Sequence, residues 1–258
     1  MSDIQVLKDN NIITVAFTRG EKKNALTVAM YDMMANAIQE AEEDTSVRAV
    51  LFKGIEGCFS AGNDLQDFMA AGRQGDFNED IPVLKFLKNI ITCTVPVIAA
   101  VDGLAIGIGT TLLLHCDQVV CSRSARLKMP FVELALVPEA ASSYMLPKMM
   151  GYSRASDLLL SARELTGAEA VDWGVATHLT DDYASCVAKA EALAADFNNR
   201  PPAAVRKSKK LLKGDLTPVL EQFKREAVEF DAQLKSPECY EAIMAFMERR
   251  APDWSKFG

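Results

Sequence analysis

The stretch that decides the fold is VPVIAAVDGLAIGIGTTLLLHCD, which runs from Val95 to Asp117. Its pattern predicts a buried strand, a glycine-punctuated turn, and a buried helix that opens directly from that turn. A helix start leaves backbone N–H groups unpaired and carries partial positive charge, so it attracts oxygen anions. Gly103, Gly107 and Gly109 have no Cβ, which lets a flat acyl group lie against the backbone.

A second turn of small residues lies upstream. CFSAGNDL, from Cys58 to Leu65, follows a strand-like run from Ala49 to Lys53. If the two turns face each other, a carbonyl oxygen between them accepts from two backbone amides. Each turn taken singly is better explained by tight packing of a helix on a strand. Their joint spacing favours an oxyanion hole, which stabilises negative charge that develops on oxygen.

Size and charge exclude several classes of function. The 258 residues are enough for one large domain or for a core with an appended subdomain. Hydrophobic residues make up 49% and charged residues 24% of the chain, as in ordinary globular proteins. The net charge of −7 argues against a nucleic-acid surface and against binding to anionic membranes.

Cysteine and histidine usage argues against a metal site. The six cysteines form no CxxC pair, and the chain has only two histidines, so we expect no zinc and reduced cysteines. The N-terminus lacks the pattern of a secretory signal, and no apolar run is long enough to span a bilayer. These features predict a cytoplasmic protein with neither a membrane nor a nucleic-acid partner.

Strands alternate with helices in the first half of the chain. A helix capped by Thr27 is expected after an N-terminal hairpin, and a surface loop is expected from Asp67 to Asp80. The alternation implies an α/β fold with right-handed crossovers and a mostly parallel sheet. Strands are predicted at residues 4–7, 12–17, 47–52, 95–101, 118–122 and 125–128, and a further helix at 81–92.

The rest of the chain is predicted to be mostly helical. Arg200-Pro201-Pro202 is a plausible hinge, which divides the chain into a core at residues 1–200 and a helical region at 201–258. The apolar stripe from Leu220 to Leu234 is broad enough to cover a partner. Helices are predicted at residues 140–150, 153–160, 168–173, 182–197, 203–212 and 218–234, and from 237 onward.

Five motifs in order resemble one family. NAL (Asn24 to Leu26) is followed by FSAGNDL, VPVIAAVDGLAIGIG, CD and LTGAEAVDWGVATHL. Over residues 10–250 the chain resembles the crotonase, or enoyl-CoA hydratase/isomerase, superfamily. The resemblance implies a spiral of ββα units with a helical C-terminal region that builds homotrimers, often paired into hexamers. It also implies an acyl-CoA thioester substrate, whose enolate is stabilised, and no cofactor beyond the coenzyme A of that substrate.

The resemblance assigns roles to residues of both turns. The oxyanion-hole amides would belong to Asn63, which follows Gly62, and to Ile108, which follows Gly107. One preorganised donor of this kind is typically worth about 2.7–4 kcal/mol of transition-state stabilisation.

The coenzyme A tail is expected beside the first turn. Lys22 and Lys23 would meet the phosphates, although a solvated surface charge is the better account of each lysine taken singly. Arg249, Arg250 or Lys256 would reach the coenzyme A of a neighbouring subunit. The adenine would lie near Asn24, Ala25 and Leu26 and against Ala61, Asp64 and Leu65.

The chain departs from the hydratases of this family. They use two glutamates, one to position water and one to protonate carbon. Thr111 and Phe131 stand at those two positions here, and neither side chain can take up a proton. This departure counts against a conventional hydratase.

The segment LVPEAASSYMLPKMMG instead resembles the Δ3,Δ2-enoyl-CoA isomerase branch, with Glu139 predicted to open a helix beside Pro138. An isomerase needs one base, which removes a proton from C2 and returns it to C4. An apolar pocket would raise the pKa of that carboxyl toward the operating pH. Residues that can supply the pocket are Met129, Phe131, Leu134, Leu136 and Val137.

Alternatives remain for the base and for the reaction. Glu139 is also explained as a carboxylate that favours a helix macrodipole, and Glu133 is a nearby alternative base. The rival reactions are ring opening or ring expansion in aromatic-CoA catabolism, and enoyl-CoA hydration. An acyl-CoA-binding scaffold without turnover is the alternative outside catalysis.

Overall fold

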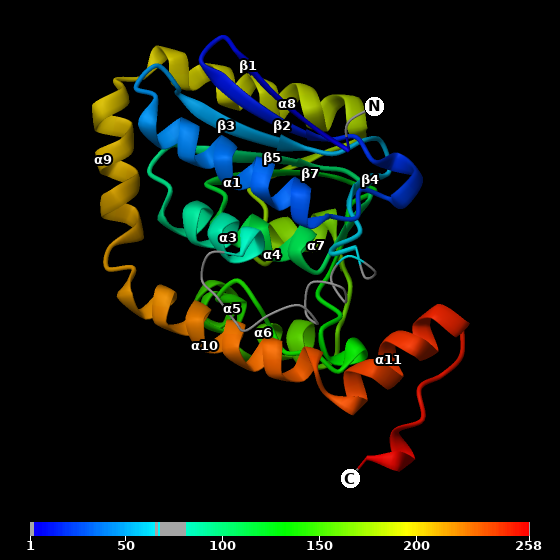
Figure 1. The fold of residues 1–258 in the computed structure, drawn as a ribbon. Coiled ribbons are helices and arrows are strands. Elements are labelled where there is room, and N and C mark those ends of the chain that lie inside the picture. Colours follow the sequence, from blue (N-terminus) through cyan, green and yellow to red (C-terminus); the bar gives the residue numbers. More distant parts are fainter. Residues whose placement is uncertain (1–2, 65–66, 68–80, 258) are drawn as a thin grey trace.

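The computed structural model describes residues 3–64, 67 and 81–257, and its ribbon is drawn in Figure 1. Its strands form two sheets, one of six strands in the order β1-β2-β3-β5-β7-β10 and one of four in the order β4-β6-β8-β9. The α/β class is therefore confirmed. The expected loop from Asp67 to Asp80 lies outside the described residues, apart from Asp67.

The larger sheet begins with the expected hairpin. Strands β1 (Ile4–Asp9) and β2 (Ile12–Phe17) are antiparallel, and Asn10 and Asn11 turn the chain with positive φ angles. The remaining neighbours pair in parallel, as the crossovers predicted. These strands are β3 (Ala49–Lys53), β5 (Val97–Val101), β7 (Gln118–Ser122) and β10 (His178–Thr180).

Helices bury both faces of this sheet, which explains why its central strands are apolar on both sides. Helices α1 (Val28–Glu43) and α3 (Pro82–Thr92) lie on one face, and α8 (Tyr183–Asp196) covers the other through Cys186, Ala190 and Ala194. Thr27 caps α1 as predicted, because its hydroxyl accepts from the N–H of Met30.

Only one strand of the smaller sheet was predicted, the one at residues 125–128, which corresponds to β8. Its strands are β4 (Cys58–Ser60), β6 (Leu104–Ile106), β8 (Arg126–Lys128) and β9 (Leu165–Thr166). Strands β3, β5 and β7 are each followed along the chain by a short strand of this sheet, which gives a repeated two-strand unit. The segments around β4 and β6 were predicted as turns, because three residues are too few to show a strand period.

The predicted buried helix after the second turn is present but short. Helix α4 (Ile108–Thr111) begins at the expected residue and continues as the 3-10 helix η2 (Leu112–His115). Downstream lie α5 (Ser142–Met150), α6 (Tyr152–Leu160) and α7 (Gly167–Asp172). The short 3-10 helices elsewhere are η1 (Gly20–Lys22), η3 (Val132–Leu134), η4 (Phe197–Asn199) and η5 (Trp254–Lys256).

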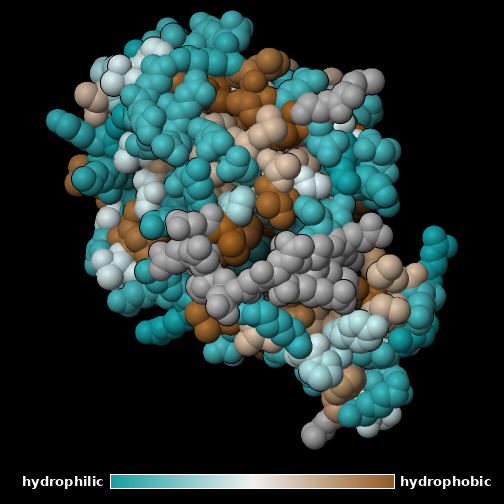
Figure 2. Space-filling view, viewed as in Figure 1, coloured by the Kyte–Doolittle hydropathy of each residue, from teal (hydrophilic) through white to brown (hydrophobic). Residues whose placement is uncertain are grey.

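Three helices form the C-terminal region. Helix α9 (Pro202–Lys213) runs along one side of the molecule, α10 (Thr217–Leu234) passes beside α5, and α11 (Pro237–Glu248) projects away from the body (Figure 1). Helix α11 and the residues after it, up to 257, form a projecting arm. Figure 2 shows hydrophilic and apolar side chains together on this arm. Its exposed apolar residues are Tyr240, Phe246, Met247 and Trp254.

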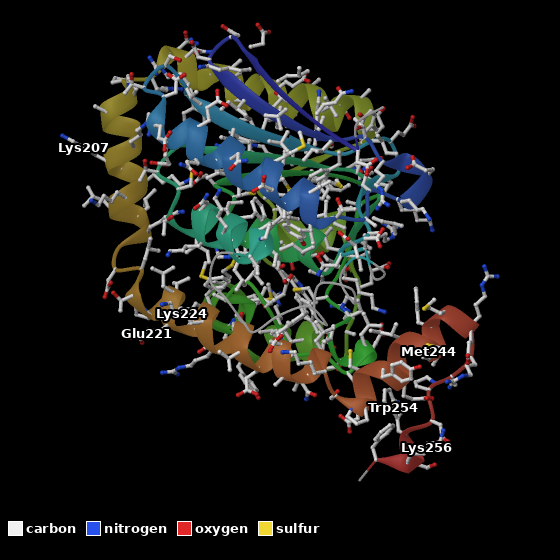
Figure 3. All side chains as sticks on the ribbon, in the orientation of Figure 1. Lys207, Glu221, Lys224, Met244, Trp254 and Lys256 are labelled. Carbon is white, nitrogen blue, oxygen red and sulfur yellow. The ribbon has the colours of Figure 1, made fainter. Side chains whose placement is uncertain are left out.

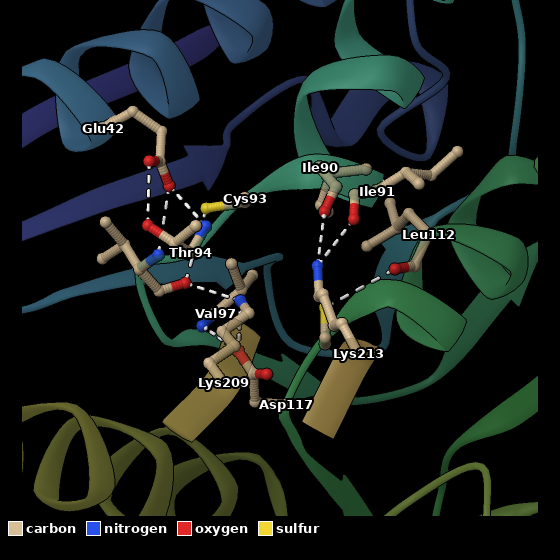
Figure 4. Close-up of polar contacts among 12 residues, drawn as sticks. Glu42, Ile90, Ile91, Cys93, Thr94, Val97, Leu112, Asp117, Lys209 and Lys213 are labelled. Atoms are coloured by element: carbon tan, nitrogen blue, oxygen red, sulfur yellow. Dashed lines mark hydrogen bonds and ion pairs between the residues drawn. The ribbon is translucent and has the colours of Figure 1, made fainter. Parts of the chain in front are cut away.

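Two lysines attach α9 to the core, Lys209, which is buried, and Lys213, which is partly buried (Figure 4). The ammonium of Lys209 donates to Asp117 Oδ2 and to the carbonyl of Val95, both at 2.6 Å. Lys213 donates to the carbonyls of Ile90 and Ile91, and burial lowers the pKa of its ammonium to about 8. Because buried ammonium groups need such partners, these contacts fix where α9 and the helices after it lie.

Candidate active site

The two glycine turns lie against each other. Strands β4 and β6 are parallel neighbours, so the turns that follow them meet at the same edge of the smaller sheet. A Cβ on Gly62 would lie 2.9 Å from the carbonyl oxygen of Ile106, and one on Gly109 would lie 2.9 Å from that of Ser60. Glycine is therefore required at both positions, and the facing turns of the sequence analysis are present.

The first turn leaves the N–H of Asn63 available. Leu26 bridges this turn, because its N–H donates to the Gly62 carbonyl at 2.8 Å and its carbonyl accepts from Asp64 at 2.9 Å. In the described part of the chain, the N–H of Asn63 itself donates to no carbonyl or side chain. It is thus a candidate donor to a ligand oxygen.

The second turn leaves the N–H of Ile108 available. Gly107 has φ 56° and ψ −120°, a conformation that favours glycine, and it immediately precedes α4. Its N–H donates to the Lys128 carbonyl, and its own carbonyl accepts from Thr110 and Thr111. Among residues 3–64, 67 and 81–257, the N–H of Ile108 has no acceptor. Both candidate donors therefore belong to the two facing turns.

Glu139 lies beside the second turn. Its Oε1 accepts from the hydroxyl of Thr111 at 2.9 Å, and Thr111 is the last residue of the helix that Ile108 begins. Only 7% of Glu139 is exposed. The pKa of its carboxyl is raised to about 7, mainly by burial; the Thr111 hydrogen bond opposes this rise and the charge of Glu226 adds to it.

The prediction that Glu139 opens a helix is wrong. Helix α5 begins three residues later, at Ser142, because Ala140 and Ala141 both adopt left-handed φ angles of 57°. The N–H of Ser142 donates back to the Glu139 carbonyl, and the Nε2–H of His115 donates to the Ala140 carbonyl at 2.7 Å. Glu139 therefore occupies a tight, buried bend, and the macrodipole explanation does not apply to it.

Tyr31 connects the two parts of the site. Its hydroxyl donates to the side-chain Oδ1 of Asn63, and burial together with the charge of Glu139 raises the pKa of its phenol. The sequence analysis missed Tyr31, which lies on the buried face of α1. The signal that could have found it is chemical, because a tyrosine on an apolar stripe needs a partner for its hydroxyl.

The apolar surroundings expected for Glu139 are partly present. Met129, Phe131 and Leu136 are buried, and the Phe131 ring packs edge-on against Phe230 of α10 with centroids 6.4 Å apart. Glu133, the alternative base, is exposed, and its carboxylate accepts from Lys128 Nζ at 2.8 Å. It therefore lacks the dry environment that a buried proton carrier needs.

The segment expected near the adenine is fastened to the first turn. The Asn24 side chain is fully buried and donates to the carbonyls of Cys58 and Phe59, while the backbone carbonyl of Asn24 accepts from the Ser60 hydroxyl. This side chain therefore supports the turn. Its Oδ1 is buried and unpaired among the described residues.

The other residues assigned to the coenzyme A tail differ in their exposure and in their partners. Asp64 pairs with Arg19 at 2.8 Å, Leu26 is buried, and Ala25 and Ala61 are partly exposed. Leu65 lies outside the described residues. Lys22 and Lys23 are exposed, which leaves them available for phosphates.

The late basic residues lie on the projecting arm. Figure 3 places Lys256 and Trp254 there, apart from the body of the molecule. Arg250 pairs with Glu241 and Glu248, and Lys256 pairs with Asp253. Within the described ranges, no three histidine, cysteine or acidic side chains gather as a metal would require. No helix in those same ranges has the length and apolar character to cross a bilayer.

Comparison with known proteins gives consistent matches. The sequence profile of the enoyl-CoA hydratase/isomerase family matches residues 8–256. Enoyl-CoA delta isomerase 2 of Rattus norvegicus is 34% identical over 251 residues, 96% of this chain and 64% of that protein. A probable enoyl-CoA hydratase of Bacillus subtilis strain 168 is 29% identical over 251 residues, 95% of this chain and 96% of that protein.

The structural comparison agrees. The crystal structure of an enoyl-CoA hydratase/isomerase from Pseudoalteromonas atlantica T6c is 39% identical, with a TM-score of 0.92 over 98% of this chain and 99% of the other. The names of the relatives include isomerases and hydratases, so they do not select one reaction. The spiral of two-strand units, the facing glycine turns and the match over residues 8–256 show that this chain belongs to the enoyl-CoA hydratase/isomerase, or crotonase, family.

Proposed function

We propose that this protein is a Δ3,Δ2-enoyl-CoA isomerase, which moves the double bond of a 3-enoyl-CoA to the 2-trans position. The observation that carries the proposal is the buried carboxyl of Glu139, which is bound to Thr111 next to two facing turns with available N–H groups. The delta isomerase name of the rat relative supports it, although this chain spans only 64% of that protein.

The proposed reaction needs only the Glu139 carboxyl and the two backbone N–H groups. The thioester oxygen accepts hydrogen bonds from the N–H groups of Asn63 and Ile108. The Glu139 carboxylate removes a proton from C2, and the electron pair forms a dienolate whose negative charge rests on that oxygen. The same carboxyl then delivers the proton to C4, which leaves the double bond between C2 and C3 and restores the carboxylate.

The surroundings of Glu139 suit a group that must act first as a base and then as an acid. A pKa of about 7 keeps both protonation states accessible at neutral pH. Desolvation is the main cause of this pKa, so the same burial that tunes the carboxyl also keeps water from competing for its proton.

Hydration is the less favoured reaction. A hydratase of this family needs a second carboxyl, and Thr111 and Phe131 occupy those positions here. The hydroxyl of Thr111 instead donates a hydrogen bond to Glu139, and Phe131 is buried against α10. Ring opening or ring expansion of an aromatic acyl-CoA also needs one acid and is therefore the second candidate reaction.

A substrate comparison tests the proposal. Purified protein is given a 3-enoyl-CoA, a 2-trans-enoyl-CoA and an epoxidised aromatic acyl-CoA in parallel, and absorbance of the conjugated enoyl thioester is followed. We expect that absorbance to rise with the first substrate. Loss of absorbance with the second would instead indicate hydration, and turnover of only the third would favour the ring reaction. Binding without turnover of any of them would indicate a scaffold.

Substitution of the base is the matching control. Glu139→Gln removes the proton-accepting oxygen but keeps the shape of the side chain, so kcat should fall on the order of 10²–10⁴-fold. Acyl-CoA binding, measured by calorimetry, should remain. Glu133→Gln alters a carboxyl that is exposed and paired with Lys128, and it should leave kcat nearly unchanged. Wild-type activity in Glu139→Gln would contradict the assignment.

We also propose that the protein assembles as a homotrimer or hexamer in the cytoplasm. The large apolar side chains exposed on the projecting arm support assembly, because an interface would bury them. Analytical ultracentrifugation would measure the mass, and a monomer at micromolar concentration would contradict this proposal.

A further inference from the structure

Helix α5 has no cap of its own. The residue before it is Ala141, which has a left-handed backbone and no side chain able to accept from the first N–H groups of the helix. Helix starts normally need such an acceptor, since their first N–H groups have no partner within the helix. Glu139 does not fill this role, because Thr111 binds its carboxyl instead.

A side chain from α10 supplies the missing acceptor. Oε1 of Glu226 accepts from the N–H of Ser143 at 2.9 Å and from its hydroxyl at 2.5 Å. Gln222, one turn earlier on α10, donates to the same hydroxyl at 3.0 Å. Two residues of α10 therefore hold the second residue of α5, four positions after Glu139.

Glu226 is itself buried, with 5% of its surface exposed. Burial raises the pKa of its carboxyl, and hydrogen bonds from Ser143 and from the backbone of Ala141 and Ser142 oppose that rise by favouring the charged form. Its Oε2 has no hydrogen-bond partner among the described residues. A buried carboxylate that only partly satisfies its oxygens is costly, which calls for an explanation beyond helix capping.

We propose that Glu226 is a positioning residue for Glu139, because from α10 it holds the start of α5, the helix that follows the bend carrying Glu139. The inference rests on the proposed function and deepens it. Because Ser142 donates to the Glu139 carbonyl, the start of α5 and the bend that carries Glu139 move as one piece. The negative charge of Glu226 makes a proton on Glu139 more favourable, so the C-terminal region sets the strength of the base.

Three ionisable groups lie around this bend in the described part of the chain. Tyr31 faces Glu139 from α1, and Glu226 faces it from α10. His115 of η2 binds the next residue, and burial lowers its pKa to about 4, so it stays neutral. Of these groups, Glu226 is the one whose charge raises the pKa of Glu139.

The test is the pH dependence of kcat/KM in Glu226→Gln. This substitution keeps an oxygen for Ser143 and removes the charge, so the pKa of Glu139 should fall. The acidic limb of the profile should move down by about half a unit to one unit. Glu229→Gln, an exposed carboxyl on the same helix, is the matched control and should leave the limb in place. A Glu226→Gln profile that superimposes on the wild-type profile overturns the proposal.

A second variant decides the matter if Glu226→Gln does not fold. Ser143→Ala keeps the carboxylate but removes the hydroxyl that binds both α10 side chains. It should lower kcat about twofold to tenfold and leave KM within about twofold, since the base is displaced while binding is preserved. Unchanged kcat in this variant would contradict the positioning role.

One measurement separates this inference from the proposed reaction. Titration of the Glu139 carboxyl by carbon-13 NMR, assigned by its loss in Glu139→Gln, requires no substrate. A lower pKa in Glu226→Gln supports the inference even if 3-enoyl-CoA is not the substrate. An isomerase whose Glu139 titrates identically with and without Glu226 keeps the proposed function and rejects the inference.

Discussion

The two halves of the candidate site are built in different ways. The oxyanion half consists of backbone: two turns in which glycine is required by close approach or by a positive φ angle. The base half consists of one side chain whose properties come from other elements, namely α1, α4, η2 and α10. Backbone geometry is written locally in the sequence, whereas the proton affinity of a carboxyl depends on what the fold places around it.

The largest effect expected in this comparison comes from removing a backbone donor of the oxyanion half. Ile108→Pro deletes one proposed donor N–H without changing any charge. Loss of one such donor should lower kcat on the order of 10²–10³-fold. Proline is tolerated at a first helical position, so the fold should be retained, and circular dichroism would check this. Full activity in a folded Ile108→Pro protein would rule out this amide as a donor.

The next prediction concerns the free energy of unfolding, which the burial of the ionised Glu139 carboxyl lowers. The folded pKa of Glu139, about 7, lies above its ordinary value of 4.5, so its protonated form is favoured by folding. That contribution is present below pH 4.5 and is lost as the pH rises through 7. Glu139→Gln should therefore be more stable than wild type at pH 8, by about 3 kcal/mol, with the difference shrinking toward pH 4. Urea denaturation at both pH values measures it, and a stability difference that does not depend on pH would contradict the burial argument.

A smaller effect tests the connection between the halves. Tyr31→Phe removes the hydroxyl that binds the Asn63 side chain and leaves the ring in place against Phe86. We expect kcat to fall about tenfold or less, because a neutral hydrogen bond typically contributes about 0.5–1.5 kcal/mol. Steady-state kinetics would show it. A loss as large as that of Ile108→Pro would mean that Tyr31 acts directly on the substrate.

The smallest effect is a shift of pH dependence. The Thr111 hydroxyl favours the ionised form of Glu139, so Thr111→Val should raise the pKa of that carboxyl. The acidic limb of kcat/KM should move up by about half a unit, opposite in direction to Glu226→Gln. A limb that moves down in Thr111→Val would show that the hydroxyl favours the protonated form.

Much of the fold could be predicted from the sequence. The Asn-Asn turn, the Thr27 cap and the buried strand before Asp102 each depend on a few neighbouring residues, and the structure has them. Strands β4, β6 and β9 of the smaller sheet escaped prediction, since three residues such as Leu104–Ile106 become a strand only when β4 and β8 pair with them.

The residues of the candidate site likewise fall into those that were predicted and those that were missed. Asn63, Ile108 and Glu139 were assigned through the family resemblance of the motifs in which they lie. Tyr31, His115 and Glu226 were missed, because each acts on a segment at least 25 residues away. The sequence alone also gave the wrong start for α5, since nothing local announces two successive alanines with left-handed backbones.

Those two alanines have a practical consequence for redesign. An L-residue in the left-handed region costs about 1–2 kcal/mol, so Ala140 and Ala141 together hold strain directly beside the carboxyl. Replacing either alanine by glycine should relieve that strain and make the position of the Glu139 carboxyl less fixed. Efforts to install a new substrate range should therefore keep residues 139–143 as they are.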